Sequence, residues 1–192
     1  MRRRKIGVWD LIFEAVSKAY DGDLQSTDPS SIKVHQHAAN VKKGSPECPA
    51  QTAGAADVRA RCMGRSRGGS TTKIHALVDA NGLPVKLELT AGQAHDGASA
   101  EDMLDDVGPG QTRLADSAYD SDRMRKSLAD RGAWANVKPS PNRVNVAAFS
   151  RFLHRYRNLV ERFFNKLKRS RAVATRYEKY DNNFLALVNL AA

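Results

Sequence analysis

The chain has 192 residues and a formal net charge of +10, from 31 lysines and arginines against 21 aspartates and glutamates. This length suits one domain of ordinary size, and the basic surplus favours a polyanionic partner, most simply DNA or RNA. No apolar run is long enough to cross a bilayer, and the basic residues 1–5 are not followed by the apolar region of a secretory signal, so a membrane role is not expected.

The first half of the chain predicts a helix, several strands and one long loop. Apolar spacing favours a helix over residues 8–19, which ends at the stop signal Asp21-Gly22-Asp23. Weak alternation predicts a strand at 30–37, on which His35 and His37 share a face and form either a polar strand surface or a metal-binding pair. Residues 40–69 lack periodicity and are expected to form a flexible loop. Strands at 71–79 and 84–90 follow, joined by the hairpin signal Asn81-Gly82.

In the second half, predicted helices and strands alternate. We expect helices at 99–107, 121–131 and 152–171, strands at 112–115 and 135–138, and an extended loop at 140–150. A hairpin-linked group of strands followed by alternating helices and strands predicts an α/β domain with a mixed sheet flanked by helices. We therefore divide the chain into an N-terminal helical segment, 1–23, and a domain, 24–192.

The run from Arg157 to Lys168 carries the most informative pattern. On a helix, Arg157, Glu161 and Lys168 fall on one face, which presents a single carboxylate on a basic ridge. Such a face suits a protein that holds a metal ion against a nucleic-acid phosphate, although a solvated Arg–Glu pair fits the same spacing. The other face is apolar and is predicted to be buried: Tyr156, Val160, Phe163 and Leu167.

Two further carboxylates lie beside predicted strands. Asp116 stands where the strand at 112–115 enters a loop, which is a frequent position for functional residues in α/β sheets, although a turn or capping role fits as well. Asp120 is the expected N-cap of the following helix. Asp28 precedes the strand at 30–37 in an Asp-Pro sequence, for which a turn is the ordinary role.

Three segments, residues 64–75, 114–122 and 157–168, resemble bacterial insertion-sequence transposases of the DDE class. The similarity is to the group whose last motif reads Tyr-x2-Arg-x3-Glu-x6-Lys, with His154 at the tyrosine position. It covers nearly the whole chain from about Val8 onward. The resemblance implies a ribonuclease H-like catalytic domain at 24–192, with 1–23 as the remnant of a DNA-binding region in a partial chain.

The same resemblance implies the catalytic residues and the cofactor. Asp28, Asp116 and Glu161 would be the catalytic triad and would bind Mg²⁺ or Mn²⁺, as two ions about 3.5–4 Å apart that assist an in-line displacement at phosphorus. Basic and polar residues would contact the DNA backbone, and Arg65, Arg67 and Lys73 could equally belong to a solvated loop. The predicted DNA-binding residues are Arg65, Arg67, Lys73, His154, Arg157 and Lys168.

We therefore predict a transposase that cleaves DNA at the terminal inverted repeats of its own element and joins the ends to a target duplex. It would act as a homo-oligomer on DNA, in the bacterial cytoplasm and associated with the nucleoid. Two alternatives stay open: a truncated, inactive remnant that still binds DNA, and a metal-dependent nuclease without strand transfer. The polar lead-in Gln25-Ser26-Thr27 and Pro29, which could displace Asp28, favour the remnant.

Overall fold

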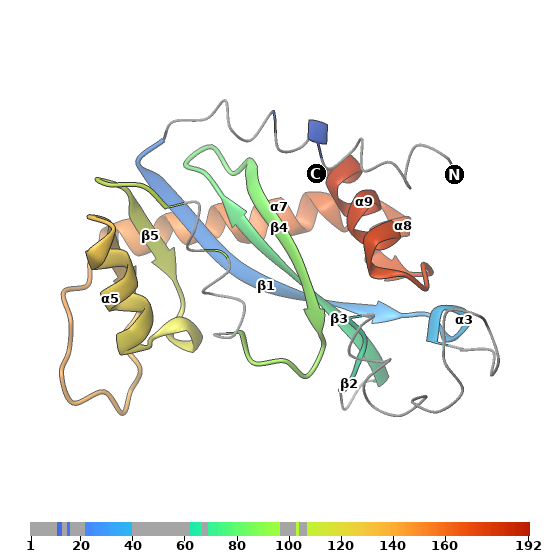
Figure 1. The fold of residues 1–192 in the computed structure, drawn as a ribbon, viewed down its shortest axis with the longest axis horizontal. Coiled ribbons are helices and arrows are strands. Elements are labelled where there is room, and N and C mark those ends of the chain that lie inside the picture. Colours follow the sequence, from blue (N-terminus) through green and yellow to red (C-terminus); the bar gives the residue numbers. More distant parts are fainter. Residues whose placement is uncertain are drawn as a thin grey trace.

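The computed structural model describes residues 11–12, 15, 22–39, 62–66, 69–96, 103 and 107–192. Most of the predicted helices at 8–19 and 99–107, and residues 40–61 and 67–68 of the predicted loop, lie outside these described residues. The described strands form one seven-stranded sheet with helices packed against it (Figure 1). Within the described residues, no helix combines the length and the apolar content that a bilayer crossing requires.

The sheet has an antiparallel half and a parallel half. β1 (Leu24–Val34), β3 (Gly69–Val78) and β4 (Pro84–Ala91) are antiparallel neighbours, and β2 (Gly64–Ser66) pairs with the start of β3. β5 (Thr112–Ala115) runs parallel to the start of β1, β6 (Trp134–Val137) runs parallel to β5, and β7 (Thr175–Arg176) pairs with the end of β1. An antiparallel meander extended by parallel strands is the ribonuclease H-like mixed sheet that the sequence predicted, and this prediction is confirmed.

The helices of the second half cover the sheet. α7 runs behind β1 and β4 in Figure 1, with α8 and α9 beyond its end, whereas α5 lies beside β5. The helical elements of the described residues are α3 (Gln36–Ala39), η3 (Ser117–Tyr119), α5 (Asp122–Asp130), α6 (Arg151–His154), η4 (Arg155–Arg157), α7 (Asn158–Leu167), α8 (Arg171–Ala174) and α9 (Asp181–Ala191).

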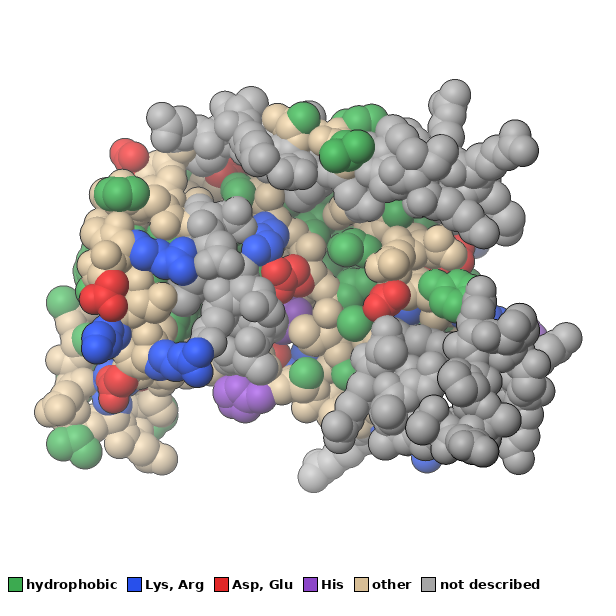
Figure 2. All heavy atoms as spheres, viewed as in Figure 1, with side chains coloured by type: hydrophobic (Ala, Val, Ile, Leu, Met, Phe, Trp, Pro, Cys, Tyr) green, Lys and Arg blue, Asp and Glu red, His purple; other side chains and the backbone are tan. Residues whose placement is uncertain are grey.

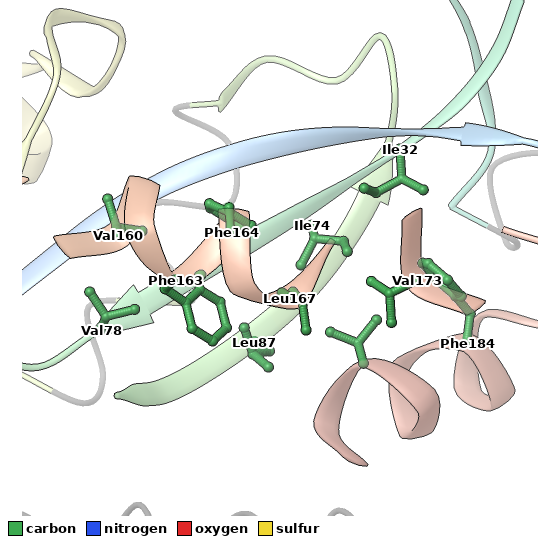
Figure 3. Packing of buried hydrophobic residues seen from close by; sticks show 12 residues of the cluster. Ile32, Ile74, Val78, Leu87, Val160, Phe163, Phe164, Leu167, Val173 and Phe184 are labelled. Carbon is green, nitrogen blue, oxygen red and sulfur yellow. The ribbon is translucent and has the colours of Figure 1, made fainter. Parts of the chain in front are cut away.

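The main core joins α7 to the sheet. Phe163 and Leu167 of α7 face Ile74, Val78 and Leu87 of the central strands (Figure 3). The buried α7 residues recur at helical spacing, so this apolar stripe is what seats the helix on the sheet. They are Val160, Phe163, Phe164 and Leu167, each at most 5% exposed.

Tyr156 was wrongly predicted to belong to this stripe, since 43% of it is exposed. The predicted helix at 152–171 is not continuous: α6, η4, α7 and α8 replace it, and α7 ends at Leu167. The 3-10 turn η4 has about three residues per turn rather than 3.6, so the residues before it fall out of phase with α7.

The hairpin prediction is confirmed, whereas three local assignments were wrong. Gly82 has φ 77° in the turn between β3 and β4, a conformation that glycine adopts without strain. β1 begins at Leu24 rather than at residue 30, and His37 lies in α3 rather than on a strand. Within the predicted loop 40–69, residues 64–66 form the edge strand β2.

Candidate active site

Asp28 lies in the middle of β1, not in a turn before a strand. It pairs with Ala76 of β3, and Pro29 pairs with His75. β1 pairs with β5 only as far as Ser26 and with β7 only from Lys33. Pro29 therefore falls where the second edge of β1 has no strand partner among the described residues, and sheets tolerate a proline at such a place. The hypothesis that Pro29 displaces Asp28 was wrong.

Of the three buried polar residues before Asp28, Gln25 and Thr27 find hydrogen-bond partners on other strands, whereas the Ser26 hydroxyl has none among the described residues. The hydroxyl of Thr27 donates to the carbonyl of Ala76 at 3.1 Å, and the Gln25 side-chain carbonyl accepts from Nη1 of Arg113 at 3.3 Å. Buried polar groups that find partners in this way cost little stability. The polar lead-in is thus compatible with a central strand that carries Asp28.

Asp116 lies beside Asp28 at the end of the parallel strands. The register pairs Ser26 of β1 with Leu114 of β5. Two further residues along each strand bring Asp28 and Asp116 to the same level and the same face of the sheet. Asp116 occupies the N-cap position of η3, but its side chain makes no capping hydrogen bond, so the capping role considered from the sequence does not account for this carboxylate.

Arg157 connects Asp28 to Glu161. Its Nη1 lies 3.0 Å from Oδ2 of Asp28, and its Nη2 lies 3.1 Å from Oε1 of Glu161. The Arg157 and Asp28 side chains are 19% and 20% exposed, whereas that of Glu161 is 56% exposed. Arg157 and Glu161 therefore form more than a solvated ion pair along one helix. Because Arg157 also pairs with Asp28, it connects the start of α7 to the central strand β1.

The group formed by Asp28, Asp116, Glu161 and Arg157 has more negative than positive side chains. Burial raises the pKa of Asp28 to about 6 from its ordinary 3.8, even though Arg157 acts to lower it, and the charges of Asp116 and Glu161 raise it further. Two of these carboxylates, Asp28 and Glu161, thus share one arginine, and Asp116 adds a further negative charge nearby. Among the described residues, no three acidic, histidine or cysteine side chains are gathered tightly enough to hold a metal ion. The guanidinium of Arg157 lies between two of the candidate ligands.

The other predicted DNA-binding residues have different surroundings. Lys73 donates to Asp96 and to the carbonyl of Ala94, each at 2.7 Å, so its ammonium is held inside the protein. His154 packs edge-on against Phe149, and burial together with the charge of Arg157 lowers its pKa, which favours a neutral ring.

Arg65 and Lys168 are exposed, and Arg67 lies outside the described residues. Lys168 belongs to a row of cations along the α6–α8 segment, in which Glu161 is the one acidic residue. α7 runs behind the sheet in Figure 1. Figure 2, which has the same viewing direction, shows the opposite face, where basic and acidic side chains are interspersed near α5. The exposed cations of this basic ridge are Arg151, Arg155, Arg162, Lys166, Lys168, Arg169 and Arg171.

Asp120 holds the segment that leads to η4, a role that the sequence did not indicate. Ser121, not Asp120, caps α5 by accepting from the backbone N–H of Met124. The buried carboxylate of Asp120 instead accepts from Nε of Arg125 at 2.8 Å, Nη1 of Arg143 at 3.0 Å and the backbone N–H of Ser140 at 2.8 Å. These bonds fix the start of the 138–150 loop.

A second anchor fixes the other end of this loop. The side-chain carbonyl of Asn136 accepts from the backbone N–H of Ser150 at 2.7 Å, and its amide donates to the Ser150 carbonyl at 3.1 Å. Because α6 and η4 follow directly, the two anchors help to place Arg157 over Asp28. Asp120 and Arg143, which form the first anchor, are more than twenty residues apart, so no pattern within one short segment could have identified it.

The structure defines a ribonuclease H-like α/β domain in which Arg157 joins carboxylates of β1 and α7, with Asp116 beside Asp28 just after β5. Residues 20–192 match the family model described as the transposase DDE domain, and the chain belongs to this family. It is 42% identical over 123 residues to the putative transposase for insertion sequence element IS6501 of Brucella ovis, an alignment that covers 63% of this chain and 94% of that protein.

One solved transposase structure shares the fold, and a second is less similar. A piggyBac transposase synaptic complex with hairpin DNA has a TM-score of 0.51 at 11% identity, over 95% of this chain and 48% of that chain. A Mos1 transposase paired-end complex with the left transposon end has a TM-score of 0.37 at 12% identity, over 98% of this chain and 58% of that chain. The chain therefore spans less than two thirds of these solved transposases.

Proposed function

We propose that this chain catalyses metal-dependent DNA cleavage and strand transfer at the ends of an insertion sequence. The observation that carries the proposal is the meeting of Asp28 and Glu161 on Arg157, with Asp116 beside Asp28 by strand register. These carboxylates come from three elements far apart in the chain. In a member of a transposase family they are the natural candidates for the catalytic triad.

The donor set fits a hard divalent cation. Asp28, Asp116 and Glu161 offer only carboxylate oxygens, which Mg²⁺ and Mn²⁺ prefer. The raised pKa of Asp28 reflects a buried carboxylate among other negative charges, and a divalent cation offsets such an arrangement. When bound, one or two such ions would activate the attacking oxygen and stabilise the leaving oxygen at phosphorus.

The remaining residues would hold the DNA. The basic ridge defined above supplies a row of cations next to Glu161, and each phosphate that it neutralises would release counterions. Lys168, the C-cap residue of α7, belongs to this ridge and would contact the DNA backbone rather than the bases. Asp120 and Arg143 hold the loop before α6, which keeps η4 in place. We propose terminal inverted repeats and a target duplex as the DNA, bound by a homo-oligomer.

The alternative of an inactive remnant is not favoured. The family match runs through residues 20–192, and Asp28 lies on the central strand β1, where it pairs with Arg157. A nuclease that cleaves but does not join strands differs from a transposase only in its products, so the experiment must detect both.

The test uses the full chain with DNA that carries the ends of its own element, a target plasmid, and Mg²⁺ or Mn²⁺. We expect nicked element ends and joined products, and Glu161→Gln should abolish both while leaving duplex binding in place, because it removes a metal-binding charge and keeps the shape. Asp130→Asn, an exposed change on α5, is the control and should remain active. Cleavage that survives Glu161→Gln or chelation would overturn the proposal, and cleavage without joining would favour the nuclease.

A further inference from the structure

Arg157 occupies the position between two carboxylates that the proposed function assigns to a metal ion. One guanidinium nitrogen pairs with Asp28 of β1 and another pairs with Glu161 of α7, at 3.0 and 3.1 Å. In the described part of the chain, Arg157 is the one basic side chain in an ion pair with either carboxylate. It is also mostly buried, so water screens these contacts only in part.

We propose that Arg157 is a displaceable counter-ion: it holds Asp28 and Glu161 together in the metal-free protein, and a divalent cation that binds these carboxylates expels it. This inference rests on the proposed function and adds to it a positioning residue with two states. Before the cation arrives, the arginine keeps two like-charged carboxylates, from a strand and a helix, close to one another. The carboxylates are thereby arranged in advance for their ligand.

The guanidinium and the cation cannot share this place. A cation that binds both carboxylates lies about 2.0–2.6 Å from their oxygens, which is inside the space that the two ion pairs of Arg157 span. The two positive groups also repel one another, most strongly at the Asp28 end, where both side chains are about four-fifths buried. The side chain can leave without a backbone change, because η4 already has helical dihedral angles and its first residue, Arg155, is exposed, so this turn borders solvent.

Displacement has a measurable consequence for metal affinity. Since the cation must break two ion pairs to enter, removal of the arginine should strengthen cation binding. A residue that helped to build the metal site would show the opposite. Arg155→Gln is the matched control, because it removes the same charge from an exposed residue two positions earlier in the same turn.

The experiment is calorimetric titration of the full chain with Mn²⁺ in the absence of DNA. We expect Arg157→Gln to bind Mn²⁺ at least about tenfold more tightly than Arg155→Gln does, which is the size of effect that neighbours of metal ligands commonly have. An affinity for Arg157→Gln equal to or weaker than that of Arg155→Gln would overturn the inference. If neither the parent chain nor the two variants bind Mn²⁺, the proposed function itself fails, so the two failures are distinguishable.

A second measurement follows the arginine directly. In protein with isotope-labelled arginine, addition of Mg²⁺ should shift the guanidinium NMR signals of Arg157, which an Arg157→Lys sample identifies by their absence. Arg125, held by Asp120 and by the carbonyls of Ala135 and Val137, is the internal reference and should not shift. Arg157 signals that stay unchanged at saturating Mg²⁺ would overturn the displacement.

Discussion

Asp28→Asn should stabilise the metal-free protein at neutral pH. Burial raises the pKa of Asp28 to about 6 in the folded chain, against an ordinary value of 3.8. Below pH ~4 the carboxyl is protonated in both the folded and the unfolded states, so Asp28 does not lower the free energy of unfolding there. As the pH rises from 3.8 to about 6, Asp28 loses its proton in the unfolded chain before it does so in the folded chain, so the free energy of unfolding falls. Above a pH of about 6 the carboxylate is ionised in both states, and the whole loss of stability remains.

The size of the effect follows from this interval. A pKa raised from 3.8 to about 6 corresponds to about 3 kcal/mol of unfolding free energy, with the attraction of Arg157 already included. For a chain of 192 residues this is about 6–12 °C in Tm. Asn has the shape of Asp without the charge, so the variant should gain most of this amount at pH ~7.5 and almost none at pH ~4.

Differential scanning calorimetry in the presence of a chelator, at both pH values, measures the prediction. Asp23→Asn is the control, because it removes the same charge from an exposed residue just before β1 and should change Tm little at either pH. A variant that is no more stable than the parent chain at neutral pH would refute the reasoning, since it would mean that Arg157 compensates the buried carboxylate completely. An equal gain at both pH values would refute it as well, because the gain would then not come from ionisation.

Asp120→Asn should cost about 3–5 kcal/mol in denaturant unfolding, because it leaves Arg125 and Arg143 without their buried partner. Burial acts to raise the pKa of Asp120, but the Ser140 N–H and the two arginines bring this pKa below its ordinary value. The parent chain should therefore lose stability as the pH falls through the folded-state pKa of Asp120, and the Asn variant should not show this loss. An unchanged unfolding midpoint in the variant would contradict this role of Asp120. Lys168→Ala should weaken duplex binding at all DNA sequences and reduce the salt slope by about 1 in fluorescence anisotropy titrations. A loss confined to one sequence would show base readout instead.

Local patterns determined much of the fold. The alternation on either side of Asn81-Gly82 predicted β3 and β4, and β5 has the predicted bounds. The helical spacing of Val160, Phe163 and Leu167 identified the buried stripe of α7. These signals are readable because side-chain direction repeats every two residues in a strand and about every 3.6 in a helix. The motifs around Asp116 and Glu161 also indicated the family.

Tertiary structure decided the place of Asp28 and the state of Arg157. The strand that carries Asp28 is polar, and it is buried only because Ala76 and Arg113, distant in sequence, satisfy Thr27 and Gln25. The parallel register of β1 and β5 brings Asp116 beside Asp28, and Arg157 at the end of η4 pairs with Asp28 rather than pointing to solvent. Spacing along one segment carries no information on such partners, because strand register and long-range hydrogen bonds are set only when separate segments pack together.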